Sequence, residues 1–421
     1  MSSRPKTLTP QRFLAGLLLL LLVFSSPLLF SYRFLRQYGE TLSPASIVDR
    51  LAANRELYYR SAMHDDLRET ALEMLRRRQP EVIALGSSLP LYFREEFFTS
   101  SFVCAAGVMD SLNDGEVFVR RMQAVARPKV VLFVLDFWWF TDPEVRFRGL
   151  INSPEQAALL STTKLRLPYK LLGRKQITLR QFFGLDPVSS GDAVTNPALG
   201  LMARIDNVGR RADGSELNGI VFTPRAWDFY APVRERFARA SEFVMQPGRF
   251  GPDLKILPER VALLQRIVKL LEDHGSHVVL VYPPMAPPIA AAMEKSGHHG
   301  HYFELGRQLT GLGREAYDFH SPAALDIPLA EFSDTHHAGN TAYMRLLVQI
   351  VRQRPDSALA SHVNLDQLVM WTEFYQGTTV AVFEKDYISV PETDFLGLGV
   401  TKHRVGTPTT PPVNPPARKT D

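Results

Sequence analysis

Val82-Ile83-Ala84-Leu85-Gly86-Ser87-Ser88 is an apolar run that ends in one glycine and two serines. Further apolar runs bounded by turn residues follow it, and such continuous runs are typical of parallel strands covered on both faces. Helical patterns lie between or after the runs, so the order of elements predicts a mostly parallel five-stranded sheet in a three-layer α/β/α sandwich. The predicted strands are Val82–Leu85, Phe102–Ala106, Val130–Leu135, Val278–Tyr282 and Ala316–Phe319, and the predicted helices are 111–126, 257–274 and 339–353.

The composition is that of a globular protein. Hydrophobic residues make up 45% of the chain and charged residues 22%, and the net charge is only +4 over 421 residues. A charge this small for the length gives no support for a nucleic-acid partner. The single cysteine, Cys104, excludes an internal disulfide, and its apolar surroundings predict a core position.

The segment from Phe13 to Tyr32 indicates in which cellular compartment the protein lies. Its roughly twenty residues carry no charge, which is the length needed to cross the hydrocarbon core of a bilayer as a helix. A cleaved signal peptide is the alternative, but the run is long for one and no Ala-x-Ala follows it. Basic residues flank both ends, with a small excess before the segment. We therefore expect an uncleaved signal anchor at 13–32, with residues 1–12 in the cytoplasm and the rest outside it.

The remaining segments carry weaker patterns. Residues 33–78 read as an amphipathic helical stalk, and 79–355 as the main α/β domain. An insertion at about 144–225 is either a lid over a site or a surface excursion. A C-terminal extension at 356–404 has aromatic patches and no assigned role. The Pro- and Thr-rich tail at 405–421 is predicted to be disordered.

Two segments, one near the start and one near the end of the predicted series of strands and helices, carry the parts of an activated serine nucleophile. Ser88 falls just past the first predicted strand. Phe332-Ser333-Asp334-Thr335-His336-His337-Ala338-Gly339 supplies a carboxylate and an imidazole three residues apart before the last predicted helix. Hydroxyl, imidazole and carboxylate together form an activated serine. Ligands of open α/β sheets bind at the carboxyl ends of the strands, so these groups are expected to share one rim.

Other residues fall on the same rim. Gly107 follows the second predicted strand, and Asp136 ends the third, two residues before Trp138. We expect Asp136, Trp138 and His336 to line the site, with Trp138 either flooring a pocket or lying in the core. The run His298-His299-Gly300-His301 is interpreted as a solvated loop rather than a metal site, because no acidic or cysteine cluster accompanies it.

These motifs resemble the blocks of the SGNH (GDSL-like) hydrolases and acyltransferases over roughly residues 79–355. Gly86-Ser87-Ser88 resembles the Gly-Asp-Ser block, which implies that Ser88 is the nucleophile. Asp334-Thr335-His336-His337 resembles the Asp-x-x-His block, with His337 as base and Asp334 as the group that orients it. That spacing selects His337 over His336.

The resemblance also implies an oxyanion hole. Gly107 resembles the second-block glycine, whose backbone N–H would act together with the N–H of Ser88. The third block, Gly-x-Asn-Asp, is replaced by Leu135-Asp136-Phe137-Trp138, so the family's asparagine donor is missing here.

This chain departs from the family's usual pattern by Gly-Ser-Ser in the first block, Asp-Phe-Trp in the third block and a single N-terminal membrane anchor. In these departures it is similar to bacterial membrane-anchored SGNH proteins that take part in D-alanyl transfer to teichoic acids or in exopolysaccharide O-acetylation. This resemblance implies an inner-membrane serine acyltransferase or esterase, with a flavodoxin-like catalytic domain in the periplasm. It would act on O-acyl groups of an envelope polysaccharide or polymer through a Ser-His-Asp triad, without metal or organic cofactor. Implied partners are the bilayer, the acylated polymer and a multi-spanning membrane O-acyltransferase. The alternative is a non-catalytic scaffold for such an acyltransferase.

Overall fold

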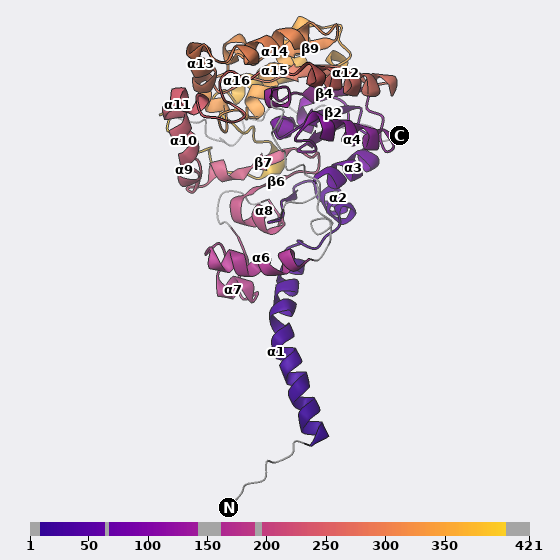
Figure 1. Cartoon of the computed structure of the whole chain (residues 1–421), viewed down its shortest axis with the longest axis vertical. Coiled ribbons are helices and arrows are strands. Elements are labelled where there is room, and N and C mark those ends of the chain that lie inside the picture. Colours follow the sequence, from indigo (N-terminus) through magenta and orange to yellow (C-terminus); the bar gives the residue numbers. More distant parts are fainter. Residues whose placement is uncertain (1–8, 64–66, 142–160, 190–195, 401–421) are drawn as a thin grey trace, which may run out of the picture.

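The computed structural model describes residues 9–63, 67–141, 161–189 and 196–400 of the chain. A long N-terminal helix, α1 (Pro10–Gln37), projects from an α/β body (Figure 1). This helix is long and apolar enough to span a membrane. Within the described ranges the strands form two sheets, one of five strands in the order β3-β2-β4-β8-β9 and one of four in the order β5-β1-β6-β7.

All strand pairings in the five-stranded sheet are parallel, as the sequence predicts. Counted along the chain, the strand order is 2-1-3-4-5, which is the order of flavodoxin-like sheets. Every residue of the first three strands is buried, which explains why their sequences are continuously apolar. The strands are β2 (Val82–Gly86), β3 (Phe102–Ala106), β4 (Val130–Val134), β8 (His277–Tyr282) and β9 (Glu315–Asp318), each within one residue of its predicted limits.

Helices pack against this sheet through apolar stripes. In α12 (Pro258–Asp273), Leu264, Ile267 and Leu271 recur at helical spacing and are fully buried. The helices α4 (Leu112–Gln123), α12 and α15 (Asn340–Gln353) correspond to the three predicted ones. Two further helices follow β8 and were not predicted, α13 (Pro287–Ser296) and α14 (Gly300–Thr310).

The segment interpreted as a stalk, 33–78, is part of the folded body. Phe34 and Leu35 at the end of α1 are buried. The helices α2 (Pro44–Ala53) and α3 (Leu67–Arg78) contribute buried apolar side chains to the main core. Between them, β1 (Tyr58–Tyr59) joins the second sheet. The end of α1 therefore enters the body directly.

The predicted insertion contributes most of the second sheet, although 144–160 and 190–195 lie outside the described residues. Its hairpin packs on the edge of the main sheet, where the N–H of Cys104 in β3 donates to the carbonyl of Asp213 over 2.7 Å. Gly214 allows this close approach, since a Cβ there would lie 2.3 Å from the Cys104 oxygen. The elements are α6 (Thr162–Gly173), α7 (Leu179–Phe182), β5 (Ala198–Leu199), α8 (Leu201–Asp206), β6 (Val208–Arg210) and β7 (Glu216–Asn218).

Three short helices, α9 (Ala226–Phe229), α10 (Ala231–Ala238) and α11 (Ala240–Val244), lead back to α12. The C-terminal extension then adds α16 (Leu365–Phe374), which packs on α15. Beyond it, Asp386 forms buried ion pairs with Arg94 at 2.7 Å and Arg211 at 3.1 Å. The extension therefore ties the main body to the β6–β7 hairpin. Residues 401–404 and the predicted disordered tail lie outside the described residues.

Candidate active site

Ser88 and His337 meet at the carboxyl ends of the parallel strands. Ser88 Oγ lies 2.7 Å from His337 Nε2. Ser88 directly follows β2 and Ser87, and a short 3-10 helix begins at Leu89. Both side chains of the pair remain partly exposed to solvent. A hydroxyl with a ring nitrogen at this distance is positioned to lose its proton to that nitrogen.

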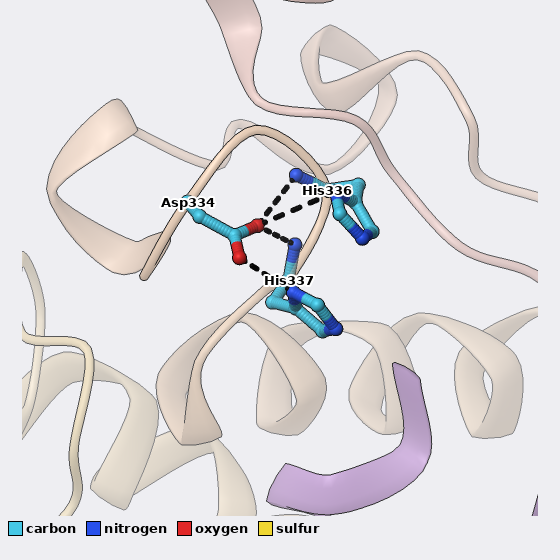
Figure 2. Close-up of side chains that lie close together, drawn as sticks. All are labelled: Asp334, His336 and His337. Carbon is cyan, nitrogen blue, oxygen red and sulfur yellow. Dashed lines mark hydrogen bonds and ion pairs between the residues drawn. The ribbon is translucent and has the colours of Figure 1, made fainter. Parts of the chain in front are cut away.

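Asp334 supports the same histidine from the other side. Its Oδ2 lies 2.7 Å from His337 Nδ1, and its Oδ1 accepts the backbone N–H groups of His336 and His337 (Figure 2). The His337 Nδ1–H therefore donates to the carboxylate, and Nε2 is left to accept the proton of Ser88. The three groups have the contacts of a Ser-His-Asp triad.

The electrostatics of the three groups agree with this arrangement. Burial alone would raise the pKa of Asp334, but the charge of His337 and the hydrogen bond that it donates hold that pKa well below its usual range. Burial opposes the charged form of His337, yet the Asp334 charge outweighs it and raises the pKa of His337. Burial lowers the pKa of His336 well below its usual value, so His336 stays neutral. Asp334 is therefore an anion that stabilises an imidazolium at His337.

The helix after His337 explains why the two ends of the chain meet. The side chain of Asn340 at the start of α15 donates to the Tyr92 carbonyl at 2.6 Å, and the Tyr343 hydroxyl donates to the Leu89 carbonyl at 2.7 Å. Both acceptors belong to the 3-10 helix that follows Ser88. These buried contacts fix the loop that carries Ser88 to the helix that follows His337.

The C-terminal extension holds the loop that carries Asp334. The N–H of Asn340 donates to the carbonyl of Thr379 at 2.8 Å, and the Thr379 hydroxyl donates to the carbonyl of Ala330 at 3.1 Å. Gly339 is required here because a Cβ would lie 2.2 Å from the Thr379 oxygen. The extension thus holds the site through the carbonyl and the hydroxyl of Thr379, and no motif in the sequence marks either group.

Asp136 follows β4 at the same rim, and it is 1% exposed. Neither of its carboxylate oxygens has a hydrogen bond of ordinary geometry. Burial raises the pKa of Asp136 to about 7, and the nearby Ser87 hydroxyl, Arg249 and His337 offset this only in part. Since β2 and β4 are neighbours, Asp136 and Ser88 flank the point where the strand order switches direction.

Gly107 has the left-handed φ of 75° that favours glycine, and a Cβ would lie 2.9 Å from Arg210 Nη2. Its N–H donates to the Ser87 carbonyl at 2.6 Å. Over the described part of the chain, no acceptor takes the N–H of Ser88. Of the two backbone donors expected for an oxyanion, one is therefore already engaged in this conformation.

Trp138 and His336 form one wall beside the triad. The two rings meet edge to face with centroids 5.6 Å apart, and the Arg249 guanidinium lies 4.5 Å from the centre of the indole. A cavity of about 10 Å³, near the lower limit for one water, borders Leu89, Trp138 and His336. Trp138 is thus a buried residue that lies beside the triad, and its role in flooring a pocket for an acyl or sugar group stays a prediction.

Asp334, His336 and His337 also place one potential metal-binding atom each within 4.8 Å of one another. Structural zinc sites use four such ligands. Both Asp334 oxygens already accept hydrogen bonds, and the Ser88 hydroxyl lies at the free nitrogen of His337. These contacts fit a triad better than a metal centre.

The interpretation of the run His298-His299-Gly300-His301 needs a correction. His299 is fully buried, and its Nε2 donates to the carbonyls of Val244 and Phe250, both at 3.1 Å. The interpretation as a solvated loop is therefore wrong for His299, which is a core histidine satisfied by backbone oxygens. His298 is exposed beside Asp253, at 3.1 Å.

Sequence reasoning missed two charged groups near the triad. The charge of Glu216 in β7 acts on the pKa of His337, and Arg249 acts on the pKa of both Asp136 and His336. Glu216 comes from the insertion, whose chain path no local pattern specifies. Arg249 lies in the turn Pro247-Gly248-Arg249-Phe250-Gly251, which predicts a loop but not its position.

No model of a known protein family matches the chain, and no curated protein is significantly similar to it. The function is therefore inferred from the geometry of the site.

Proposed function

We propose that the protein is a membrane-anchored serine acyltransferase or esterase that acts on O-acyl groups of a cell-envelope polysaccharide or polymer. The observation that carries this proposal is the contact chain from Ser88 Oγ through the His337 ring to Asp334, with both links at 2.7 Å. The resemblance to SGNH proteins agrees with this contact chain and with the five-stranded sheet, and it extends the fold to a three-layer α/β/α sandwich.

In the proposed reaction, Ser88 Oγ attacks the acyl carbonyl while His337 Nε2 takes the hydroxyl proton. Asp334 holds the imidazole tautomer and stabilises the cation. Collapse of the tetrahedral intermediate leaves an acyl-serine, and His337 returns the proton to the departing oxygen. Water or an acceptor hydroxyl then attacks the acyl-serine by the same route, so hydrolysis and transfer share every protein group.

The developing oxyanion needs hydrogen-bond donors to stabilise its charge. The N–H of Ser88 is one, and the N–H of Gly107 becomes a second when its bond to the Ser87 carbonyl opens. Asp136 replaces the missing asparagine as a neutral carboxylic acid that donates its O–H. Its burial without a hydrogen bond of ordinary geometry and its place beside Ser87 support this role, because a carboxylate there would repel the oxyanion.

The proposed topology follows from α1. An uncharged segment of about twenty residues spans an inner membrane, and the body lies in the periplasm with the envelope polymer. A multi-spanning O-acyltransferase is the proposed acyl donor partner. The non-catalytic scaffold remains the alternative, favoured by the missing asparagine and by the engaged N–H of Gly107.

Turnover of a short-chain acyl ester by the detergent-solubilised full chain tests the proposed role of His337 as the general base. His337→Ala is expected to lower kcat by about 10⁶-fold, because proton transfer is lost. Asp334→Asn is expected to lower kcat by about 10⁴-fold, because the wrong imidazole tautomer is favoured. The matched control is His298→Ala, an exposed histidine that also pairs with an aspartate. Turnover by His337→Ala equal to that of the wild type would rule out the triad.

The role of Asp136 has its own signature in the pH profile of kcat/KM. The pKa of Asp136 is raised to about 7, so the neutral donor exists below pH 7 and is lost above it. Asp136→Asn keeps a donor that does not titrate, so the fall in activity above pH 7 should disappear. Asp136→Leu should lose about 10²–10³-fold at every pH. An inactive Asp136→Asn variant, folded as judged by circular dichroism, would mean that the carboxylate form is the one required.

A further inference from the structure

Two helices of the insertion pack along the end of the apolar helix. The Tyr169 hydroxyl of α6 donates to the Pro27 carbonyl of α1 at 2.6 Å, and Ser31 Oγ donates to the Leu165 carbonyl at 2.5 Å. The rings of Phe30 and Phe183 meet edge to face at 5.5 Å. Figure 1 shows α6 lying across the end of α1 where it enters the body, with α7 beside it.

These contacts set the depth of α6 and α7 if α1 spans a bilayer. The uncharged segment 13–32 matches the hydrocarbon core, so its end near Tyr32 marks the boundary on the side of the body. Pro27 lies five residues before that end, which is about 7.5 Å inside the boundary at 1.5 Å per residue. Helices that lie in a membrane interface bury about 5–10 Å of their depth. Tyr169 therefore reaches the level of the interface.

The surface of residues 161–189 has the chemistry of such an interface. Four large apolar or aromatic side chains are exposed, Tyr169 by 39%, Leu179 by 64%, Phe183 by 49% and Leu185 by 66%. The segment also exposes five basic residues, Arg166, Lys170, Arg174, Lys175 and Arg180, against one acidic residue, Asp186, which pairs with Arg180. An open hollow of about 450 Å³ borders Arg33 and Arg36 on the adjoining turn of α1. Exposed aromatics among basic residues are typical of binding to anionic lipid surfaces.

We propose that residues 161–189 form a lipid platform, which rests on the bilayer surface around the end of α1 and takes anionic headgroups. This inference rests on the proposed membrane anchor and goes beyond it. The platform and the anchor share one core, in which Phe34 of α1 and Tyr38 directly after α1 pack with Leu171, Phe182 and Leu201. The anchor is thus rigidly joined to the body, and the platform fixes the height and tilt of the Ser88 site above the membrane.

Fluorescence quenching from the lipid tests the platform in the full chain reconstituted into phosphatidylglycerol vesicles. A fluorophore is placed on Phe183→Cys or, as a second variant, on Leu185→Cys. Cys104 is 3% exposed and burial raises the pKa of its thiol to about 12, so it does not compete for the label. The matched control is Phe374→Cys in α16, because Phe374 and Phe183 have the same exposed fraction of 49%.

The platform predicts that a headgroup-level quencher removes most of the fluorescence at positions 183 and 185 and leaves position 374 bright. In phosphatidylcholine vesicles the loss should be smaller, because the basic residues no longer attract the surface. If both platform probes stay bright while the chain resists carbonate extraction, the platform is wrong and the anchor stands. Release of the chain by carbonate would overturn the anchor and the platform together. Equal quenching at position 374 would show unspecific contact and would also overturn the platform.

Discussion

Ser88→Ala is expected to lower turnover of a short-chain acyl ester by about 10⁶-fold, which is the scale seen when a triad serine is removed. The reason is that Ser88 supplies the hydroxyl that contacts His337 Nε2 within the described residues. Stability should change little, since Ser88 is only partly buried and its side chain bonds only to His337 among the described residues. Ester turnover and the urea unfolding midpoint, measured on the same preparation, separate these two effects.

Ser100 provides the matched control. Its hydroxyl lies 2.6 Å from His362 Nδ1, so it forms a second serine–histidine contact in the same chain. Burial lowers the pKa of His362, and the charge of Glu81 offsets this only in part, whereas the charge of Asp334 outweighs burial at His337. Ser100→Ala is therefore expected to keep full turnover. If Ser100→Ala lost as much activity as Ser88→Ala, the assignment of Ser88 as the nucleophile would be wrong.

Asp386→Ala is expected to lower the free energy of unfolding by about 3–5 kcal/mol, because it leaves two buried guanidinium groups without their shared carboxylate. The side chain of Arg94 is 0% exposed and that of Arg211 is 4% exposed. Urea unfolding of the detergent-solubilised chain at pH 7 measures the loss. The exposed pair Arg180–Asp186 is the control, and Asp186→Ala should cost less than about 1 kcal/mol.

The same ion pairs predict an acid sensitivity. The charges of Arg211 and Arg94 overcome the effect of burial and lower the pKa of Asp386 to about 2. A depressed carboxyl pKa contributes stability that is complete above the unfolded value near 3.9 and is lost as the pH falls through 2. Asp386→Ala should therefore unfold with a weaker pH dependence in that range. A stability loss for Asp386→Ala no larger than that of Asp186→Ala would contradict the role given to the extension.

The main sheet was predictable because every residue of its strands β2, β3 and β4 is buried. Apolar continuity in strands such as Val130–Val134 follows from burial, and turn residues mark their ends. The spacing Asp-x-x-His pointed to His337 rather than His336, and His337 is the histidine that contacts Ser88. Both features are local in sequence, so one chain is enough to find them.

The second sheet and the extension were not predictable because the contacts that hold them are not local in sequence. The strands β1 and β5 have two residues each, and their pairing joins Tyr58 to Ala198 across a long stretch of chain. The extension acts through the Thr379 carbonyl and through the buried Asp386, neither of which belongs to a periodic pattern. Contacts of this kind depend on the tertiary fold rather than on local propensity.

Covalent labelling by a serine-directed fluorophosphonate is the most direct measurement of the central claim, that Ser88 is a nucleophile activated by His337. The folded full chain should carry one adduct, and peptide mapping should place it on Ser88. The adduct should be absent from Ser88→Ala, greatly slowed in His337→Ala, and unchanged in Ser100→Ala. A folded protein that stays unlabelled, or whose label maps to another serine, would contradict the claim and favour the scaffold.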